Sequence, residues 1–394
     1  MSAIAATPSE LRWRPLEELA TVIMGQSPPS SAYNTEGGGL PFFQGKAEFG
    51  ALYPTAAKWC NAPKKIAEPG DILMSVRAPV GPTNLAAERC CIGRGLAAIR
   101  PREGVRSKWV LYAFRSMESV IDALGTGTTF KAISGETLRQ LAVPVASLEH
   151  QDLAIAEIEN QFSRLDEAVS NLRRVELNLR RYCQAKIAAA CPKPGVTLSS
   201  GWRWQKLSDL GELARGKSKH RPRNDPKLYG GPFPFIQTAE VRASGGRIRH
   251  YSQTYNKFGL AQSRLWPKGT LCITIAANIA ETGILEFNAC FPDSIVGLRV
   301  EGNPALARYV ELYLRSVKDR LARLAPATAQ KNINLEILEQ LEIPVPPGDL
   351  VERVVATIEK GLSIAEQVNI EVAVNCLRAN RFKEAQLMKT FSIR

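Results

Sequence analysis

Two long stretches of the chain carry apolar residues at the alternating three- and four-residue spacing of a coiled-coil seam. In the first stretch these positions are Ile155, Ile158, Phe162, Leu165, Val169, Leu172 and Leu179, with Glu176 and Cys183 as weak points. In the second they are Val355, Ile358, Leu362, Ala365, Val372 and Cys376, with Asn369 interrupting the seam and Gly361 weakening it early. Polar residues fill the other faces, so the pattern predicts two long helices with one apolar stripe each.

The stretches that precede these helices follow a different pattern, because they are rich in glycine and proline and contain only short apolar runs. Runs such as 71–76 and 270–275 are typical of strands bounded by turns, whereas 108–123 and 306–324 favour helices. Each stretch ends in a proline-containing segment, 143–145 or 343–347, which we expect to stop the globular part. The pattern predicts a mixed α/β domain before each long helix.

The two halves of the chain align with each other when the sequence is shifted by 200 residues. Matching pairs include Val110/Val310, Thr128/Thr328, Lys131/Lys331, Ile133/Ile333, Pro144/Pro344 and Ile158/Ile358. With slightly smaller shifts the beginnings match too, Trp13 with Trp204 and Pro41-Phe42 with Pro234-Phe235. Chance does not sustain one register over this length, so the chain is a tandem duplication.

The duplication predicts how the parts are organised. We expect a first domain over 1–147, a long helix over 148–191, a Pro/Gly linker over 192–200, a second domain over 201–347 and a long helix over 348–394. Neither helix can bury its stripe alone, and two halves related by an approximate two-fold axis place the helices antiparallel. The alternative is that each stripe packs on its own domain, but a helix of about 40 residues spans about 60 Å and overhangs it.

The charge of the chain changes this picture by suggesting a polyanionic partner. The net charge is +13 with a pI near 9.4. The stretch 215–257 holds ten Lys and Arg residues against two acids and interleaves them with aromatic residues. A basic, structured segment of this kind favours a nucleic-acid interface over a disordered basic tail.

Cysteine and histidine usage narrows the function classes. Eight cysteines lie scattered without a C-x-x-C motif, and the three histidines are isolated, so we expect neither a zinc site nor a disulfide framework. This usage fits the reducing cytoplasm. No apolar run reaches the roughly 20 residues of a membrane helix, and the N-terminal residues show no secretion signal.

One motif favours an alternative function. Residues 211–218 match the phosphate-binding P-loop pattern G-x-x-x-x-G-K-S, in which Lys217 would contact phosphate and Ser218 magnesium. The preceding run 202–210 is polar and amphipathic instead of a buried strand, and the duplicate position, 20–27, lacks the first glycine and the lysine. A P-loop nucleotide-binding protein with a helical appendage therefore remains the competing hypothesis.

Other enzyme classes find less support. The chain has no Asn-Pro-Pro-Tyr/Phe segment and no glycine-rich strand-turn for a methyl donor, so it is not itself a methyltransferase. Pro292-Asp293 followed by Glu301 resembles a nuclease carboxylate pair only without the usual lysine, and its duplicate at Ile92-Gly93 has neither residue. A core turn is the better interpretation.

The order of parts resembles the specificity subunit of type I restriction-modification systems. The likeness rests on the segment 125–133 (Gly-Thr-Gly-Thr-Thr-Phe-Lys-Ala-Ile), the Leu-x-x-Leu-x-Val-Pro stop and the helix 157–168 leading into Leu179-Arg-Arg-Tyr182. It covers essentially the whole chain. The second copy departs from it at 325–327, Ala-Pro-Ala, where the first has Gly-Thr-Gly.

The resemblance implies an α+β fold with two tandem target recognition domains, each followed by a long helix, the two helices forming an antiparallel coiled coil. Each domain would read one half of a split site in double-stranded DNA. The helices would dock two methyltransferase subunits, and restriction subunits would join them. Those partners would carry S-adenosylmethionine, ATP and magnesium, while this chain would hold no cofactor, catalyse no reaction and act in the cytoplasm, away from membranes.

Candidate DNA contacts follow from side-chain chemistry, because Arg and Lys suit guanine and phosphate whereas Gln and Asn suit adenine edges. In the first domain the candidates are Gln26, Ser27, Gln44, Lys46, Arg77, Asn84, Thr128 and Lys131. In the second they are Lys217, Lys219, Arg221, Arg223, Gln237, Asn278, Thr328 and Lys331. The duplicated regions diverge most between 20–105 and 211–305, so we expect the domains to recognise different sequences.

Overall fold

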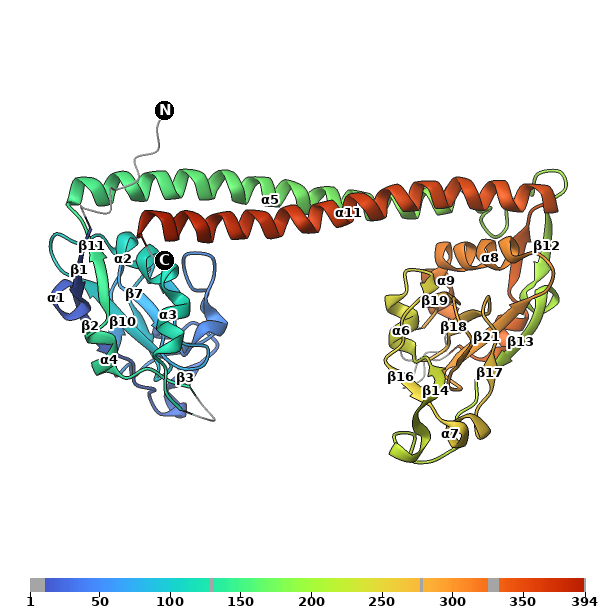
Figure 1. The fold of residues 1–394 in the computed structure, drawn as a ribbon, viewed down its shortest axis with the longest axis horizontal. Helices are drawn as coiled ribbons and strands as arrows, with labels where there is room; N and C mark the ends of the chain where they lie inside the picture. The colour runs from blue at the N-terminus through green and yellow to red at the C-terminus, as the bar shows by residue number, and fades with distance from the viewer. Residues whose placement is uncertain (1–10, 128–130, 277–278, 325–332, 393–394) are drawn as a thin grey trace. The chain divides into compact units, whose positions relative to one another are not determined.

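The computed structural model describes residues 11–127, 131–276, 279–324 and 333–392. The chain forms two compact units, one of Met1–Arg173 with Ala373–Arg394 and one of Arg174–Val372. Each unit contains one globular domain and part of each long helix (Figure 1).

Two small sheets and a strand pair form the first domain. One antiparallel sheet has the order β2 (Ala20–Met24), β10 (Leu96–Pro101), β7 (Ile72–Ser75), β8 (Thr83–Leu85). The other has the order β3 (Tyr33–Asn34), β5 (Trp59–Cys60), β4 (Leu40–Phe43), β9 (Cys90–Ile92), β6 (Ile66–Ala67), in which β4 and β9 are parallel. A separate pair, β1 (Arg12–Pro15) and β11 (Ala142–Val145), joins the beginning of the domain to its end.

Short helices cover these sheets. They are α1 (Leu16–Leu19), α2 (Ser107–Ser116), α3 (Glu118–Ala123) and α4 (Gly135–Arg139), with 3-10 turns η1 (Ser30–Ala32) and η2 (Lys46–Glu48). All four residues of β7 are buried, as its uninterrupted apolar run predicted. α2 packs one face into the same core through Trp109, Val110 and Phe114, which are fully buried.

The second domain repeats this plan. Its first sheet has the order β13 (Gly211–Arg215), β21 (Ile295–Val300), β18 (Leu271–Thr274), β19 (Thr282–Leu285), β15 (Arg247–Ile248). The second has the order β16 (Gln253–Tyr255), β14 (Tyr229–Phe235), β20 (Ala289–Cys290), β17 (Leu265–Trp266). The closing pair is β12 (Arg203–Lys206) with β22 (Glu342–Val345). The order β2-β10-β7-β8 corresponds strand for strand to β13-β21-β18-β19, which confirms the predicted duplication, while β15 and β3 each occur in one domain only.

The second domain's helices also follow the first copy. They are α6 (Thr238–Ala243), α7 (Lys257–Ala261), α8 (Pro304–Ser316), α9 (Lys318–Leu324) and α10 (Leu335–Glu339), with η3 (Leu207–Leu210) and η4 (Pro226–Leu228). Equivalent side chains cap equivalent helices, since Ser134 accepts from the amide of Thr137 at α4 and Asn334 from that of Ile337 at α10.

The proline-containing stops are strands, which the sequence interpretation did not anticipate. Pro144 lies opposite Trp13 in the pair β1–β11, and Pro344 lies opposite Trp204 in β12–β22. Proline is tolerated in such a two-stranded pair because its missing N–H can face away from the partner strand. The carbonyls of these prolines accept hydrogen bonds from Trp109 Nε1 at 2.8 Å and from the Tyr309 hydroxyl at 2.6 Å.

The two long helices have the predicted seams. α5 (Leu148–Ala190) and α11 (Gly348–Thr390) are 43 residues each. The predicted apolar positions are buried or half-buried along both helices, while most positions between them are exposed. Gly361, predicted as a weak point, is buried, and the Tyr182 hydroxyl lies 3.6 Å from where its Cβ would stand, an ordinary contact distance that would also admit alanine.

The helices run antiparallel within each unit. In the first unit Phe162 and Asp166 of α5 meet Lys383 of α11, and Ile155 shares a core with Phe391 further along. In the second unit Ile187 near the end of α5 shares a core with Val351 and Val355 near the start of α11. Rising numbers on one helix therefore meet falling numbers on the other, which confirms the predicted pairing direction inside both units.

The end of α11 completes the core of the first domain. The Phe391 ring is fully buried, and its centroid lies 4.8 Å from that of Trp109. We expect Phe391→Ala to destabilise the first domain by about 3–5 kcal/mol, because it leaves a cavity beside a large buried ring. Hydrogen exchange of the β7 and β10 amides measures this loss. Met388→Ala, at an exposed position one turn earlier, is the control, and equal effects of the two changes would contradict the packing role.

Candidate nucleic-acid interface

Three segments of the first domain converge on the turn 93–95 between β9 and β10. Gln26 N donates to the carbonyl of Ile92 at 3.1 Å, and Gly93 N to that of Phe43 at 2.8 Å. Val76 N donates to the carbonyl of Gly95 at 2.9 Å. The residues that follow β2, β4 and β7 therefore surround this turn, which we call the first-domain turn.

Glycine is required where these segments meet. A Cβ on Gly25 would stand 2.2 Å from the carbonyl oxygen of Gly93, and one on Gly95 would stand 2.1 Å from that of Gln44. No side chain fits at such distances, so the close approach of the backbones depends on these glycines.

The first-domain turn gathers four of the candidate DNA contacts. The side chains of Gln26, Gln44 and Arg77 are exposed around it, and the half-buried Ser27 hydroxyl accepts from the amide of Arg94 at 3.2 Å. Arg94 itself is exposed at the turn and was missed by the sequence interpretation. Its place between two glycines, in Gly-Arg-Gly, is the signal that could have found it.

The remaining first-domain candidates have different surroundings. Lys46 is exposed at the start of η2, after Gln44. The Lys131 ammonium forms an ion pair with Asp122 at 2.6 Å, which leaves it partly engaged. Thr128 lies outside the described residues.

The prediction of Asn84 as a DNA contact is wrong. Its side chain is fully buried, and its amide accepts from Gly50 N at 3.3 Å and donates to the Gly50 carbonyl at 2.9 Å. These bonds fasten β8 to the segment after η2. The amide chemistry was suitable for an adenine edge, but the strand pairing turns it inward.

The second domain holds an equivalent turn at 292–294, the second-domain turn. Lys217 N donates to the Phe291 carbonyl at 3.1 Å, and Ile275 N to the Ser294 carbonyl at 2.9 Å. These are the counterparts of the bonds made by Gln26 and Val76. The match places Asp293 on Arg94, a shift of 199 residues, and so corrects by one residue the comparison of Pro292-Asp293 with Ile92-Gly93.

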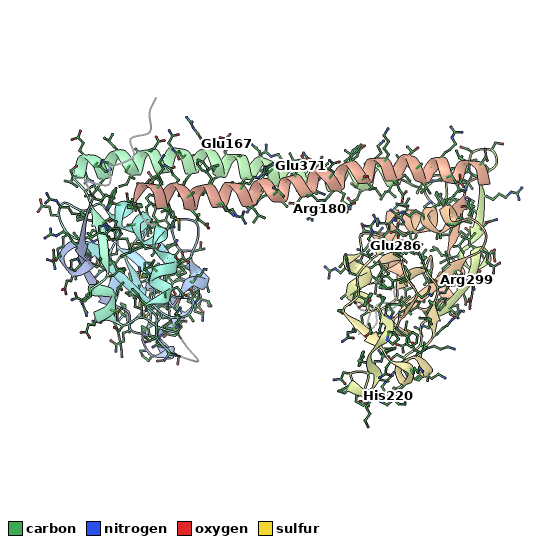
Figure 2. All side chains as sticks on the ribbon, viewed as in Figure 1. Glu167, Arg180, His220, Glu286, Arg299 and Glu371 are labelled. Atoms are coloured by element: carbon green, nitrogen blue, oxygen red, sulfur yellow. The ribbon has the colours of Figure 1, made fainter. Side chains whose placement is uncertain are left out.

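A basic loop stands beside the second-domain turn. Lys217, Lys219, Arg221 and Arg223 are all exposed in it, whereas the first domain has no charged residue over 25–34. Figure 2 shows His220 of this loop at the end of the second domain farthest from the helices. Exposed cations at the tip of a domain are suited to phosphate contacts.

Hydrogen bonds hold the basic loop in one conformation. The His220 ring bonds Asp225 at 2.9 Å, and the Arg221 guanidinium donates to the carbonyls of Ser218 and His220 at 2.7 and 2.8 Å. The Lys227 amide and the His220 ring hold the pKa of Asp225 below its ordinary value. A loop organised in this way presents its cations without a large ordering cost on binding.

Of the other second-domain candidates, the structure describes only Gln237. Gln237 is exposed and its amide donates to Gln253 at 2.7 Å, so it is engaged with a neighbour. Asn278, Thr328 and Lys331 lie outside the described residues.

The P-loop hypothesis does not fit the local structure. Residues 211–215 are strand β13, and Lys217 and Ser218 lie in the loop after it, where no helix begins before η4. The Ser218 side chain is buried. A P-loop needs a helix opening directly at its lysine to cradle phosphate, so the motif match is coincidental.

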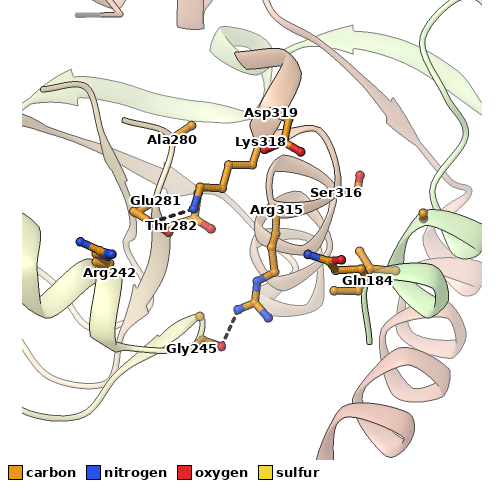
Figure 3. A pocket seen from close by; sticks show the side chains of 13 residues that line it. Gln184, Arg242, Gly245, Ala280, Glu281, Thr282, Arg315, Ser316, Lys318 and Asp319 are labelled. Carbon is orange, nitrogen blue, oxygen red and sulfur yellow. Dashed lines mark hydrogen bonds and ion pairs between the residues drawn. The ribbon is translucent and has the colours of Figure 1, made fainter. Parts of the chain in front are cut away.

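A cavity of about 490 Å³ lies in the second unit between the end of α5 and the α8–α9 junction (Figure 3). Two of its cations already have acidic partners, since Lys318 pairs with Glu281 at 2.7 Å and Arg315 with Glu311 at 2.9 Å. The cavity is therefore a poor competitor with the second-domain turn as a phosphate site. Among the described residues, no group of three His, Cys, Asp or Glu side chains could hold a metal ion.

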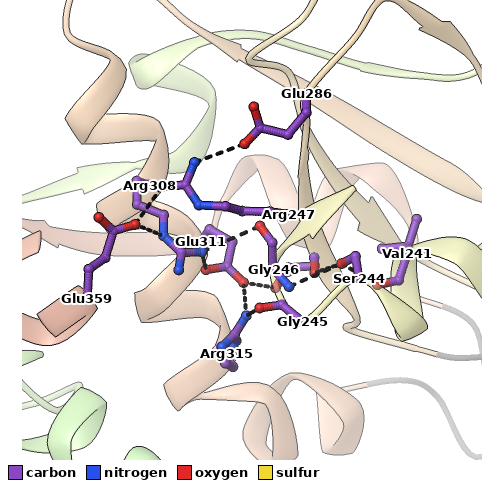
Figure 4. Close-up of polar contacts among 11 residues, drawn as sticks. Val241, Ser244, Gly245, Gly246, Arg247, Glu286, Arg308, Glu311, Arg315 and Glu359 are labelled. Atoms are coloured by element: carbon purple, nitrogen blue, oxygen red, sulfur yellow. Dashed lines mark hydrogen bonds and ion pairs between the residues drawn. The ribbon is translucent and has the colours of Figure 1, made fainter. Parts of the chain in front are cut away.

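An ionic network lines the same side of the second domain (Figure 4). The carboxylate of Glu311, fully buried, bonds Arg308 at 2.6 Å, Arg315 at 2.9 Å and the Thr282 hydroxyl at 3.0 Å. Burial raises the pKa of Glu311, although the two arginines oppose that shift. The network reaches α11 because Arg308 also bonds Glu359 at 3.0 Å.

The far end of this network is anchored on α11. Arg247 bonds Glu359 at 2.5 Å and Glu286 at 2.9 Å. Burial disfavours ionised Glu359, but Arg247 and Arg308 outweigh it and lower the pKa of Glu359. The bonds fasten the second domain to the helix on which the seam lies.

The first domain fills the equivalent space with apolar side chains. Arg115 donates to the Ala51 carbonyl as Arg315 does to that of Gly245, which matches Leu52 with Gly246. Leu111 occupies the place of Glu311, and Leu52 packs against the same core as Leu111. A Cβ on Gly246 would stand 2.0 Å from a nitrogen of Arg315 and 2.8 Å from a carboxylate oxygen of Glu311, so a leucine there would require the network side chains to move.

The sequence model of one protein family, described as the type I restriction modification DNA specificity domain, matches residues 8–177 and 199–360. Three relatives are similar to parts of the chain. A putative type I restriction enzyme MjaX specificity subunit of Methanocaldococcus jannaschii is 48% identical over 136 residues, covering 34% of this chain and 32% of that protein. The MjaIX specificity subunit of the same organism is 25% identical, covering 60% of each chain. The EcoBI specificity subunit of Escherichia coli is 20% identical, covering 82% of this chain and 73% of its own.

Solved structures share the fold along nearly the whole chain. A chain from a structure of a type I R-M system, concerned with complex assembly and conformational transition, superposes with a TM-score of 0.77 at 18% identity, covering 98% of both chains. The HsdS subunit from Thermoanaerobacter tengcongensis gives a TM-score of 0.57 at 19% identity, covering 98% of this chain and 97% of its own. The matches to the first two sequence relatives span only 32% and 60% of their lengths.

Proposed function

Because the chain belongs to the type I restriction modification DNA specificity domain family, we propose that it is the non-catalytic specificity subunit of such a system and reads a two-part DNA sequence, one half with each domain. The observation that carries the proposal is the repeated turn. Both domains gather exposed polar and cationic side chains around equivalent turns, but with different residues in the two copies. Base edges are distinguished by such donor and acceptor side chains, and phosphates by the cations beside them.

The affinity for DNA has a physical source in the net charge of +13. Each cation that neutralises a phosphate releases condensed counterions, which favours binding and makes it dependent on salt. Lys217 and Lys219 are exposed beside the second-domain turn and suit this role.

Two methyltransferase subunits are the partners that we assign to the long helices. Exposed apolar side chains recur at duplicated positions, Leu177 with Tyr182 in the second unit and Leu377 with Phe382 in the first, where they are 48, 44, 60 and 53% exposed. Apolar side chains exposed at matching positions favour two equivalent partner sites. Restriction subunits would join through those partners.

Catalysis belongs to the partners in this proposal, which would carry S-adenosylmethionine, ATP and magnesium. Two buried thiols are unsuited to nucleophilic attack, since burial raises the pKa of Cys90 to about 12 and that of Cys191 equally far. All eight cysteines are free, in keeping with action in the cytoplasm. None of the helices in the described part of the chain has the length and apolar content that crossing a lipid bilayer requires.

A selection experiment tests the proposal. The purified full chain is mixed with randomised DNA duplexes, and the bound duplexes are sequenced. We expect enrichment of one two-part motif with a constant number of unspecified bases between its parts. Absence of any enriched sequence, or ATP binding that Lys217→Ala abolishes, would overturn the proposal.

The two halves of the motif are expected to be independent. Exchanging residues 1–147 for those of a related subunit should change one half of the selected motif and leave the other half and the spacing unchanged. The physical reason is that the two domains have separate cores and separate turns. The reciprocal exchange of 201–347 is the control, and a change in both halves after either exchange would contradict modular reading.

A further inference from the structure

An arginine lies at the equivalent turn in both domains, although it comes from different parts of the chain. In the first domain Arg94 supplies it from the turn itself. In the second domain the matching residue is Asp293, and its carboxylate holds Arg223 of the basic loop. Two different sequence solutions thus bring an arginine to equivalent turns of the fold.

The Arg223–Asp293 pair leaves most of the guanidinium available. One nitrogen, Nη2, donates to both carboxylate oxygens at 2.7 and 2.9 Å, across 70 residues of chain. Within the described residues no hydrogen bond engages Nη1 or Nε of Arg223. The two side chains are 47 and 45% exposed, so the free N–H groups can meet a ligand from solvent.

The backbone that carries Arg223 is held as firmly as its side chain. The Tyr229 hydroxyl donates to the Arg223 carbonyl at 2.7 Å, and the Arg221 guanidinium caps two carbonyls of the same loop. An ion pair this exposed contributes little to stability, so stability alone does not account for it. A side chain held from two directions with donors left free is suited to recognition.

We propose that Arg223, positioned by Asp293, reads a guanine in the half-site of the second domain, and that Arg94 reads a guanine in the half-site of the first. The inference rests on the proposed function. Guanine presents two acceptors, O6 and N7, on its major-groove edge, and a free N–H group on Nη1 or Nε of Arg223 can donate to one of them. Lys217 and Lys219 are left with the phosphates, because an ammonium group is a point charge without the fixed donor directions of a guanidinium.

Selection from randomised duplexes by full-length variants tests this inference. Arg223→Ala should relax one G·C pair in the second-domain half, with discrimination at that pair falling on the order of 10- to 100-fold. Arg94→Ala should do the same in the first-domain half. Asp293→Asn should relax the same pair as Arg223→Ala, more weakly, since the arginine remains but is no longer held by charge.

Lys219→Ala is the matched control from the same loop. It should weaken binding to all sequences alike and leave the motif unchanged. Equal weakening of all sequences by Arg223→Ala would assign that residue to a phosphate and overturn the proposal, as would an unchanged motif. Relaxation by Arg223→Ala with none by Asp293→Asn would refute the positioning role. Failure of the wild-type chain to select any motif would instead overturn the proposed function.

Discussion

Replacing Glu311 by alanine is expected to lower the free energy of unfolding of the second domain by about 3–5 kcal/mol. The fully buried carboxylate holds Arg308 and Arg315, whose side chains are 9 and 29% exposed. Its removal leaves two cations close together beside a cavity, with Arg315 deprived of its carboxylate and Arg308 held by Glu359 alone. The loss is large because the penalty for an unpaired buried charge exceeds the value of the ion pair itself.

Hydrogen exchange of the β18 and β19 amides measures this loss within the second domain. Glu286→Gln is the matched control from the exposed end of the same network, with an expected effect of at most about 1 kcal/mol. The double change Arg308→Met with Glu311→Leu replaces the buried ion pair by apolar side chains, as Leu111 does at the position of Glu311 in the first domain, and should restore most of the stability. Equal effects of Glu311→Ala and Glu286→Gln would show that the buried cluster does not stabilise the domain.

The long helices could be predicted from the sequence because their burial is periodic over twelve turns. One register of the apolar stripe accounts for the buried positions from Ile155 to Leu179 and from Val355 to Cys376. The antiparallel direction followed from the duplication, since two equal halves pair about a two-fold axis. The charged contact between Asp166 and Lys383 did not follow, because 217 residues separate them and many exposed pairs were possible.

Most strands of the second sheets could not be predicted. β3, β5 and β6 contain two residues each, too few for an alternating pattern to emerge. Pro144 and Pro344 argued against strands, yet each lies in a strand that pairs on one side only within the described residues. A proline argues against a central strand more strongly than against an edge strand.

In the candidate site, too, some features could be predicted from the sequence and others could not. Gln26 and Gln44 were chosen for their amide chemistry and lie exposed around the first-domain turn, whereas Asn84 has the same chemistry and is buried. Side-chain type does not reveal which way a strand residue points. The pairing of Arg223 with Asp293 could not be predicted from the sequence, because loops that are distant in sequence meet only after folding.

Lengthening both long helices by one heptad is expected to change the spacing between the two halves of the DNA site. The chain passes from one unit to the other inside α5 and α11, between Arg173 and Arg174 and between Val372 and Ala373. One heptad inserted after Leu172 and one after Val372 keep the seam on one face and add about 10 Å at 1.5 Å per residue. At about 3.4 Å per base pair, the preferred spacer should grow by two or three base pairs.

A library of duplexes that differ only in spacer length measures the effect. Binding to the original spacer should fall on the order of 100-fold or more, since one half-site can no longer be contacted and its base contacts are lost. The half-site sequences should stay as they were. The control inserts three residues at each position, which turns the stripes away from each other and should lower helix stability. An unchanged spacer preference in the heptad variant would show that the helices do not determine the spacing.

Mapping of methylated adenines in cells that produce the chain together with a methyltransferase subunit tests the central claim most directly. The account predicts methylation at one two-part motif with a constant spacer, in which Arg223→Ala relaxes a single G·C pair of one half. It also predicts no sequence-directed methylation when the chain is omitted. Methylation at a continuous motif, or at the same sites with and without the chain, would contradict reading of a split site by two domains.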